Sequence, residues 1–503
     1  MVAISSVAAF AALASTSLAK KTGIPACDAL IDAGLGNLVL NPTGPNGAYI
    51  DSVNSYYGAG SRQLRPYCIL QPETAEDVSK AVKALSALSG AGKSDIAVRG
   101  RGHGHGENNN INQGVTIDLG RMNETTIQTS SCNQTIAAVG AGSELAGPAV
   151  EAEKHNLTVA SGRVGNVGVA GLTLGFGMGF MTGHLGFAYD SVVNYEIVLS
   201  NGDIVEANRN ENPDLFKALK GGGSNFGVVT RFDFKTHPVK NVYGGLMFHP
   251  WSYREQLADS MIKVIGEIEE NHDDSQFIMY MNHPGAPEPV VGNMIMNLHG
   301  RDDTPLNLAA NEMDKIVDMG AHSTMAEFLN AYHDPGDSFN AWHTTIFHNE
   351  RRLLDKVADI FLEVVADTKR AFPESSATII FVLQLMPKFY GTQPGTGNVL
   401  GLDKTLDADS IILAAEAGAA TLEERAFFTT RLAKVIVDVE EYAKSVDGYV
   451  PYKYMNYADP SQDIFSSYGA DNVAFLKRVA REYDPAGFFQ TRVTGGFKLS
   501  NVQ

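Results

Sequence analysis

Two glycine-rich segments constrain the fold of this 503-residue chain more than any other feature. The first, VRGRGHGHG from Val98 to Gly106, follows a short apolar run and places a glycine at every second position. The second carries glycines at 162, 165, 168, 171, 175, 177 and 179. Glycine accepts positive φ and lets backbone N–H groups approach a ligand, so such segments can form a concave anion site. Close packing and tight turns are the alternative use of the same residues.

Spacing rules out several phosphate-binding and hydrolase motifs. The run SGAGKS ends like a Walker A loop, but Ala87 stands where the first glycine belongs, and the segment leads from a helix to a strand. Gly175, Gly177 and Gly179 do not match the dinucleotide fingerprint G-x-G-x-x-G, and the motifs GxSxG and HExxH do not occur. The glycines therefore do not indicate a nicotinamide Rossmann site, a hydrolase or a zincin.

The order of predicted elements indicates an α+β chain with two large parts. Up to Pro238, short β-type runs predominate: helical spacing predicts a helix over 75–88, Asn201-Gly202 predicts a hairpin, and Asn212 before Pro213 predicts a capped helix start. Beyond Pro238, amphipathic helices over 254–270, 353–372 and 423–445 alternate with short strands such as 377–385. A last helix begins near Ala470 and ends at Asp484-Pro485.

Charge and hydropathy exclude some partners. The chain carries 57 acidic and 39 basic side chains, a formal charge of -18, which argues against nucleic acid because phosphate binding needs a basic face. No later run reaches the ~18 uninterrupted apolar residues of a membrane span. Residues 1–19 resemble a secretory signal cleaved after Ala19, which predicts a secreted, extracellular protein without a membrane anchor.

Sequons and cysteines are compatible with export. The candidate glycosylation sites, each in an N-x-T triplet, are Asn123, Asn133 and Asn156. An oxidising compartment favours pairing two of the three cysteines, and we predict a disulfide between Cys27 and Cys68 with Cys132 free. Three unpaired thiols are the alternative, because connectivity does not follow from sequence.

His103 and His105 in the first glycine segment admit three interpretations. In an extended segment, residues two apart face the same side and could share a metal ion, but no third ligand is apparent, so no metal is predicted. Either ring could instead be a buried structural histidine. The third interpretation is a covalent bond between an imidazole and a cofactor, which spacing alone does not reveal.

The motifs taken together resemble the FAD-binding domain of the vanillyl-alcohol-oxidase superfamily. The segments VRGRGH, GVTIDLGRMN, SGRVGNVGVAGLTLGFGMGF and GGGSNFGVVTRFDF carry the resemblance, and YKYMNYADPSQDIFSSYG is similar to the tail of its berberine-bridge-enzyme-like branch. The resemblance implies a two-part PCMH-type FAD-binding domain over 20–240. It further implies an α+β substrate domain with an antiparallel sheet flanked by helices over 241–450, and a tail over 451–503 that returns to the FAD domain.

The resemblance also implies a flavin covalently attached to one histidine. The family pattern R-[SG]-x-G-H places the bond on His103, and Val164 stands where many relatives carry a second, cysteinyl attachment, so a single bond is expected. Val167 is the position where a small valine accompanies oxygen access in relatives. The cofactor contacts implied are Arg99, Gly100, Arg101, Gly102, His103, Gly104, His105, Gly162, Val164, Val167, Gly168, Gly171, Leu172, Val228 and Asn456.

For the chemistry, the resemblance points to the Y-x-N-Y segment of the tail. Tyr454 matches a tyrosine used as general base in similar members, and Asn456 an asparagine near the flavin. A tyrosine with an ordinary pKa of ~10 needs a nearby cation, and Lys453 and Arg101 are the candidates. An alternating strand face with structural hydroxyls is the alternative. Leu185 replaces an active-site tyrosine of some sugar-oxidising relatives, which leaves the substrate open.

The sequence thus predicts a secreted FAD-linked oxidase. Its partners would be a small-molecule alcohol, sugar or amine and O2, with H2O2 as product. A dehydrogenase with another electron acceptor and an oxidocyclase of secondary metabolism are alternatives within this class. A non-catalytic FAD-containing binding protein is the alternative outside it. Oligomeric state is left open.

Overall fold

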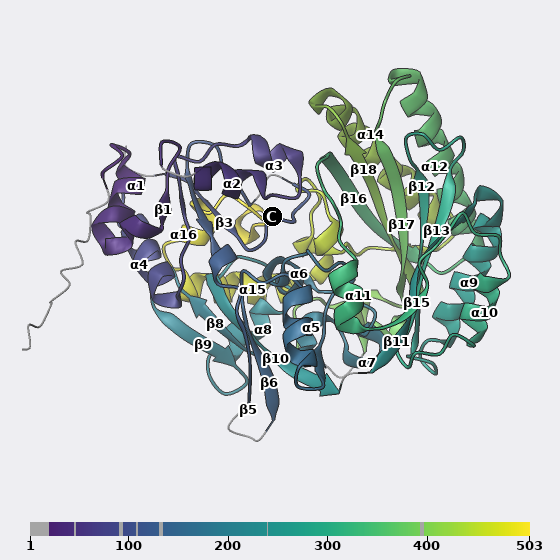
Figure 1. Cartoon of the computed structure of the whole chain (residues 1–503), viewed down its shortest axis with the longest axis horizontal. Helices are drawn as coiled ribbons and strands as arrows, with labels where there is room; N and C mark the ends of the chain where they lie inside the picture. The colour runs from purple at the N-terminus through teal and green to yellow at the C-terminus, as the bar shows by residue number, and fades with distance from the viewer. Residues whose placement is uncertain are drawn as a thin grey trace, which may run out of the picture.

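The chain forms three β-sheets with helices on their faces (Figure 1). This computed structural model describes residues 20–44, 47–89, 94–106, 109–129, 134–238, 240–392 and 397–502. The predicted signal segment 1–19, Cys132 and Asn133 lie outside the described residues. Mixed sheets and helices of this kind agree with the predicted α+β class.

The first sheet carries the first glycine segment at its edge. Its strand order is β1-β2-β4-β3, with β2, β4 and β3 parallel. The elements are α1 (Pro25–Leu30), β1 (Val39–Leu40), α2 (Ala48–Asn54), α3 (Ala59–Gln63), β2 (Cys68–Leu70), α4 (Ala75–Ser86), β3 (Ile96–Arg99) and β4 (Val115–Asp118). Helix α4 begins where the Thr74 hydroxyl accepts a hydrogen bond from the Asp77 N–H, as its capping pattern predicts. The carboxyl end of β3 then leads directly into Gly100.

The second sheet is antiparallel, in the order β5-β6-β10-β8-β9, with β7 also paired to β10. Its strands are β5 (Thr125–Thr129), β6 (Thr135–Gly140), β7 (Leu157–Val159), β8 (Val192–Val198), β9 (Ile204–Asn208) and β10 (Val228–Pro238). Its helices are α5 (Ala146–Glu153), α6 (Val169–Gly175), α7 (Thr182–Leu185) and α8 (Pro213–Leu219). The predicted hairpin at Asn201-Gly202 joins β8 to β9.

One predicted cap is wrong. Asn212 precedes α8, but its backbone is left-handed, with φ 47°, and its side chain caps nothing. The Asn212 amide instead donates to the Glu206 carbonyl, and its oxygen accepts a hydrogen bond from the Tyr483 hydroxyl. A tertiary contact with a residue far along the chain has therefore replaced the local hydrogen bond.

The third sheet begins at Asn241 and is antiparallel, in the order β14-β11-β13-β12-β17-β18-β16-β19, with β15 paired to β11. Its strands are β11 (Asn241–Pro250), β12 (Asp274–Asn282), β13 (Val290–Asn297), β14 (Val317–Asp318), β15 (Ala321–Thr324), β16 (Phe339–His348), β17 (Thr378–Met386), β18 (Ser410–Ala419) and β19 (Tyr449–Val450). Its helices are α9 (Arg254–Glu267), α10 (Pro305–Asn311), α11 (Met325–Ala331), α12 (Arg351–Ala371), α13 (Leu402–Thr405) and α14 (Leu422–Ser445).

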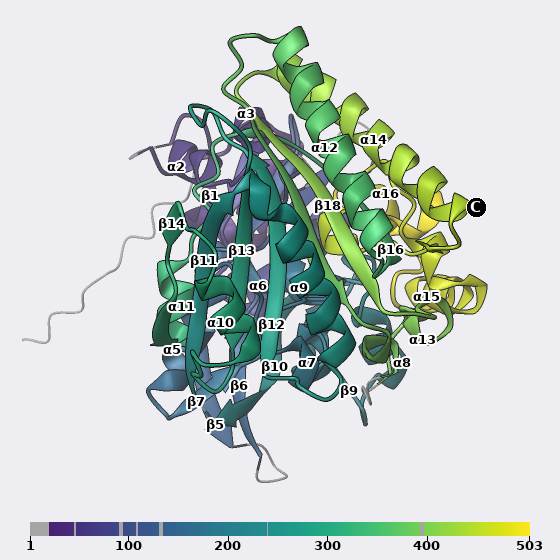
Figure 2. The same ribbon diagram turned by 90° about the vertical axis from the view of Figure 1, so that its right-hand side faces the viewer.

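Helices α9, α12 and α14 cover the outer face of this sheet (Figure 2). Their apolar sides pack on alternate strand residues such as Tyr280, Phe381 and Leu413, and all three side chains are buried. Because successive strand side chains point to opposite faces, the intervening residues face the first two sheets. The sheet therefore presents its second face to the glycine-rich segments.

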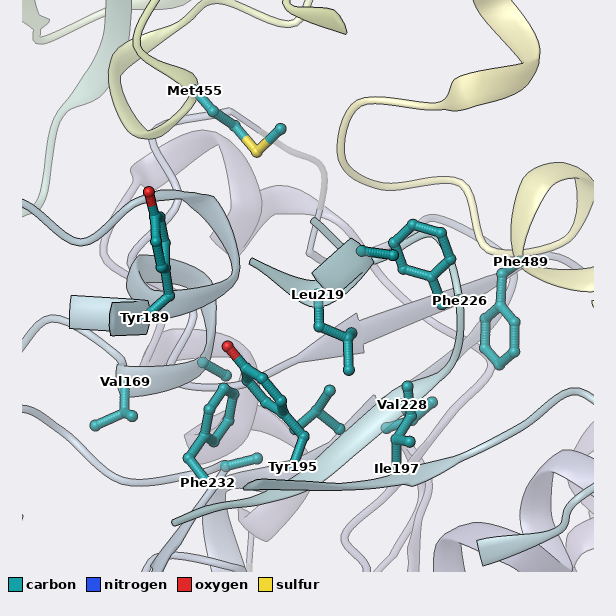
Figure 3. Close-up of a cluster of buried hydrophobic side chains, with 14 of the residues drawn as sticks. Val169, Tyr189, Tyr195, Ile197, Leu219, Phe226, Val228, Phe232, Met455 and Phe489 are labelled. Atoms are coloured by element: carbon teal, nitrogen blue, oxygen red, sulfur yellow. The ribbon is translucent and has the colours of Figure 1, made fainter. Parts of the chain in front are cut away.

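The tail returns to the N-terminal sheets. After β19 it contains α15 (Ala470–Tyr483) and α16 (Phe488–Thr491), and Val493 pairs with Ile96 of β3. Figure 3 shows aromatic and aliphatic side chains of β8 and β10, with Met455 and Phe489 of the tail in the same cluster. The N-terminal sheets and the tail thus share one hydrophobic core.

A disulfide joins Cys27 of α1 to Cys68 of β2, the pairing that the sequence analysis favoured. Both cysteines are fully buried. The sequon residues Asn123 and Asn156 are exposed. No helix among the described residues is both long and apolar enough to cross a bilayer.

We expect the double substitution Cys27→Ser/Cys68→Ser to lower the free energy of unfolding by about 4 kcal/mol. The bond closes a loop of 41 residues, and the lost constraint on the unfolded chain has this magnitude. Urea unfolding followed by fluorescence measures the change, with Cys132→Ser as control. A loss below about 1 kcal/mol would contradict the assignment.

Candidate functional site

The first glycine segment offers a row of unused backbone donors. None of the backbone N–H groups from Gly100 to His105 donates a hydrogen bond to another described residue. Gly102 has φ 71°, and a Cβ there would lie 2.8 Å from both the Arg99 Nε and the Tyr56 ring. Only glycine fits this position, and the donors that follow it form a nest suited to an anion.

The second glycine segment packs directly on the first. A Cβ on Gly168 would lie 3.2 Å from the Arg101 backbone nitrogen, and a Cβ on Gly100 would lie 3.3 Å from the Ala141 carbonyl. Bridge pairing between Glu144 and Gly168 holds the second segment in this place. Three stretches of backbone thus approach within the width of a side chain, which explains the density of glycine.

The two arginines of the first segment are both engaged. Arg99 is 3% exposed; its guanidinium donates to the Ser52 and Ser55 carbonyls and lies 3.6 Å from Asp118. Its charge holds α2 against the sheet, although its Nε is buried without a hydrogen-bond partner. Arg101 forms an ion pair with Glu144, yet its Nε is buried without a partner.

His103 is held as a neutral ring. It stacks on Tyr57 with ring centroids 4.1 Å apart. Burial is the main cause that lowers the pKa of His103 to about 4, although Asp334 and a backbone hydrogen bond to Asn166 act in the opposite direction. At neutral pH one ring nitrogen therefore carries a free lone pair, as bonding to a carbon atom requires.

His105 has a separate environment. Its ring stacks on Trp342 at 4.7 Å, its Nε2 lies 3.1 Å from the Ala458 carbonyl, and burial lowers its pKa. Different neighbours thus hold the two rings. In the described part of the chain, the His and carboxylate atoms close enough for one metal ion are those of His184, Asp273 and His299. They lie outside both glycine segments, and the Lys240 ammonium is 3.3 Å from His299.

The second glycine segment also contacts the end of α11 and the loop that follows it. Gly165 donates to the Tyr332 carbonyl, and a Cβ on Gly165 would collide with the Leu329 carbonyl at 1.8 Å. The Asn166 amide donates to the Asp334 carbonyl and its oxygen accepts from the Asp334 N–H. The remaining predicted contacts here are half-buried Val164, Val167 and Leu172, buried Gly162 and exposed Gly171. Val228 begins β10 and is buried.

Tyr454 does not have the surroundings predicted for a base. Its hydroxyl accepts a hydrogen bond from the Met178 N–H at 3.1 Å, and its side chain is buried. Burial raises the pKa of Tyr454 instead of lowering it. The two predicted cations are engaged elsewhere, since Lys453 pairs with Glu440 at 2.6 Å and Arg101 with Glu144. The predicted activation of Tyr454 by these cations is therefore wrong.

Asn456 fastens the tail to the second glycine segment. Its side-chain oxygen accepts from the Phe176 N–H at 2.9 Å, and its amide donates to the Gly171 and Leu172 carbonyls at 3.2 Å. A Cβ on Gly175 would lie 2.5 Å from this amide. All of its hydrogen-bonding groups are used in docking.

Tyr457 holds the arrangement that the sequence analysis assigned to Tyr454. Its hydroxyl oxygen accepts hydrogen bonds from the Arg163 Nη1 at 3.4 Å and from the Gln384 Nε2. Arg163 forms no ion pair with a described carboxylate and lies over the ring of Phe277 at 5.1 Å. Two donors, one of them cationic, thus meet at this hydroxyl oxygen.

A cluster of Tyr57, Asp334 and Glu416, which the sequence analysis did not indicate, lies beside His103. The Tyr57 hydroxyl donates to the Asp334 Oδ2 at 3.0 Å, and the half-buried Glu416 of β18 lies near both. Burial raises the pKa of Glu416 well above its ordinary value, and the Asp334 charge raises it further, which favours the neutral acid. A polar residue within an apolar strand is the signal that could have found both Glu416 and Gln384.

The residues present fit a long diphosphate cofactor with a planar ring system. Free backbone donors between Gly100 and His105 suit the diphosphate, and the buried, unpartnered Nε of Arg101 adds a donor beside them. Neutral His103 lies within this row, and the tail that carries Tyr457 meets the row where the Ala458 carbonyl lies 3.1 Å from the His105 Nε2. The site can therefore bind an anionic cofactor and move a proton beside it.

Comparison with known families agrees with this fit. The profile of the FAD binding domain family matches residues 66–208, which contain both glycine segments. The FAD-dependent monooxygenase drtC of Aspergillus calidoustus is 31% identical over 461 residues, covering 90% of this chain and 86% of the relative.

Solved structures show the same fold. The xylooligosaccharide oxidase of Myceliophthora thermophila C1 has a TM-score of 0.72 and 19% identity, covering 94% of this chain and 99% of that one. Berberine bridge enzyme from Eschscholzia californica has a TM-score of 0.69 and 16% identity, covering 95% and 100%. Both are similar in fold to this chain over nearly its whole length.

We expect Asn456→Ala to lower the free energy of unfolding by about 2–3 kcal/mol, because it leaves the Phe176 N–H and two carbonyls without their partner. Urea denaturation measures the loss. Asn456→Asp keeps the acceptor for Phe176 but removes the donors, and should be intermediate. Wild-type stability of the alanine variant would show that the amide does not fasten the tail.

Proposed function

This chain belongs to the FAD-linked oxidoreductases of the vanillyl-alcohol-oxidase superfamily, and from that premise we propose a secreted oxidase with its flavin covalently held by His103. Its substrate would be a small molecule with an oxidisable alcohol, sugar or amine carbon, and O2 would accept the electrons to give H2O2. The observation that carries the proposal is the Tyr457 hydroxyl held between Arg163 and Gln384.

The chain supplies both a residue for covalent attachment and backbone donors for the cofactor. When bound, FAD supplies a two-electron acceptor. The backbone donors from Gly100 to His105 would hold its diphosphate, and the segment from Gly162 to Leu172 would lie along the other side. The pKa of about 4 keeps the His103 ring neutral and able to form the bond. Val164 offers no second attachment.

Tyr457 is the proton acceptor in this proposal. As the substrate carbon is oxidised, the proton of its O–H or N–H group must pass to a base within hydrogen-bonding distance. Arg163 and Gln384 donate hydrogen bonds to the Tyr457 oxygen and orient it as the group that accepts this proton. Tyr454 and Asn456 keep positioning roles, because their polar atoms hold the tail against residues 171–178.

Further features support both the use of oxygen and export. The relative drtC is named a monooxygenase, and both oxidases and monooxygenases use O2, which favours oxygen over another electron acceptor. Val167, half-buried in the second segment, is the predicted point of oxygen access. The buried disulfide and the exposed sequon residues Asn123 and Asn156 support export, because disulfides persist in oxidising compartments.

We expect the purified wild-type protein to keep its yellow colour on acid precipitation, and His103→Ala to release it. Because the His103 ring is neutral above about pH 4, attachment of FAD to the apoprotein should proceed at one rate between about pH 5 and 8. With a histidine of ordinary pKa, the rate of attachment would fall as the pH is lowered from 8 to 5, because the ring would become protonated. His105→Ala is the matched control and should retain the bond. Free flavin from the wild type would contradict the assignment.

We expect Tyr457→Phe to slow anaerobic flavin reduction about 10²–10⁴-fold, because the proton acceptor is lost. Arg163→Met should slow it about 10²-fold, since the Tyr457 hydroxyl loses one of its two hydrogen-bond donors. Stopped-flow absorbance with a panel of alcohols, sugars and amines measures both. Tyr454→Phe keeps the ring in the core and should stay within about tenfold of the wild type. The reverse ranking of the two tyrosines would restore Tyr454 as the base.

Rapid return of the colour in air would identify an oxidase, and slow return would identify a dehydrogenase. A protein whose flavin is reduced by no compound would be a binding protein. Each outcome separates one alternative from the proposal.

A further inference from the structure

The inner face of the third sheet can be mapped from strand register. Its outer-face residues, such as Ile278, Phe381 and Leu413, pack under the helices. The residues between them form transverse rows on the inner face because paired residues of neighbouring strands point to the same side. The first row is Phe277–Gln384–Ile412–Ile346, the second Met279–Val382–Ala414–Thr344 and the third Met281–Ile380–Glu416–Trp342.

The first row of this face is packed and its third row is partly exposed. Ile346 and Ile412 join the core of the N-terminal sheets, and Phe277 packs with Phe180 in a smaller cluster. In the second row, Val382, Ala414 and Thr344 are buried. The apolar side chains of the second and third rows that belong to none of the hydrophobic clusters of the described residues are Met279, Val382, Ala414, Met281, Ile380 and Trp342. Met279, Met281 and Ile380 are half-buried. An apolar strip left partly in water gains free energy when an apolar molecule covers it.

The proposed proton acceptor adjoins this strip. The Tyr457 hydroxyl contacts Gln384 of the first row, and its ring lies 5.6 Å from Trp342 of the third row. A molecule on Met279, Met281 and Ile380 therefore lies beside the group that would take its proton.

Two unused polar groups mark the ends of the strip. The Gln384 Oε1 is buried without a hydrogen-bond partner, while its Nε2 donates to Tyr457. The Glu416 carboxyl forms no hydrogen bond or ion pair with another described residue. Gln384 and Ile380, the strand partner of Glu416, are four residues apart, about 13 Å along β17. After the lengths of the two side chains are subtracted, the space between their polar ends matches a molecule with two fused rings.

We propose that the substrate is a compact, mainly apolar ring alcohol or amine that lies across β12, β17 and β18. Its hydroxyl or amine faces Gln384 and Tyr457, and an acceptor oxygen at its far end receives a hydrogen bond from the Glu416 carboxyl. The inference rests on the proposed function, which names the atom to be oxidised but not the rest of the molecule.

A sugar fits this face poorly. Every hydroxyl of a sugar removed from water needs a partner, and an unpaired one costs free energy. Of the side chains on the strip, Thr344 already donates to the Leu413 carbonyl, which leaves Gln384, Glu416 and the indole N–H of Trp342 on these strands. The methionines beside them give polarizable surface that adapts to ring systems.

Calorimetric binding to the anaerobic holoprotein, with its flavin reduced beforehand, tests the inference without depending on turnover. The probes are methyl 6-(hydroxymethyl)naphthalene-2-carboxylate, 2-(hydroxymethyl)naphthalene, which lacks the acceptor, and xylobiose. We expect the ester to bind about tenfold tighter than the plain naphthyl alcohol, the value of one hydrogen bond to a buried acid, and xylobiose to bind weakest. Ile380→Ala should weaken both naphthyl probes about fivefold to tenfold.

The Glu416 variants isolate the acceptor contact. Glu416→Gln keeps a donor and should keep the preference for the ester, whereas Glu416→Leu should abolish it and leave the plain alcohol unaffected. Xylobiose binding as tightly as the ester, a preference that survives Glu416→Leu, or no binding of either naphthyl probe would each overturn the inference.

The same probes, added to the holoprotein with oxidised flavin, distinguish the two proposals. An ester that binds with the expected pattern but never bleaches the flavin would remove the oxidase proposal and keep the binding surface. Bleaching by xylobiose, with no binding of the naphthyl probes, would keep the oxidase proposal and remove the inferred substrate class.

Discussion

The close approach of backbone to backbone along residues 162–179 holds the rest of the molecule in place. Gly168 lies against Arg101 of the first glycine segment, Gly165 against the Leu329 carbonyl of α11, and Gly175 against Asn456 of the tail. A Cβ would collide at Gly165 and Gly175 and would be tightly packed at Gly168. One short segment therefore joins three parts of the chain that are far apart in sequence, and the candidate site lies where they meet.

The candidate site contains two kinds of group, buried groups that are held neutral and a cation. Burial keeps His103 uncharged and favours the neutral acid of Glu416, while Asp334 remains beside both. Arg163 has no acidic partner among the described residues and directs its charge to Tyr457. A neutral ring available for bonding and a tyrosine oxygen that accepts two hydrogen bonds are thus parts of the candidate site. This division agrees with a covalently held flavin and a proton acceptor as separate functions.

The third sheet completes the site by the simple rule of strand alternation. Residues under α9, α12 and α14 make a dry core, and the alternate residues form the inner face. Gln384 and Glu416 are polar exceptions on that face, in strands that otherwise read as apolar. Their unused hydrogen-bonding groups, together with half-buried methionines and Ile380, describe a substrate that is mostly apolar and polar at its two ends.

The sequence by itself determined the fold class, both glycine segments, the main helices and the family, because these depend on periodicity, on glycine and on local motifs. It also singled out His103. Only the tertiary structure decided which groups the hydroxyls of Tyr454 and Tyr457 contact. The expected strand alternation stops at Val450, and a short helical turn over Met455–Tyr457 sends one hydroxyl to Met178 and the other to Arg163. Likewise Arg99, Arg101 and Lys453 look alike as cations in a sequence. Which carboxylate or carbonyl each of them contacts depends on residues far along the chain. Local periodicity does not predict such contacts.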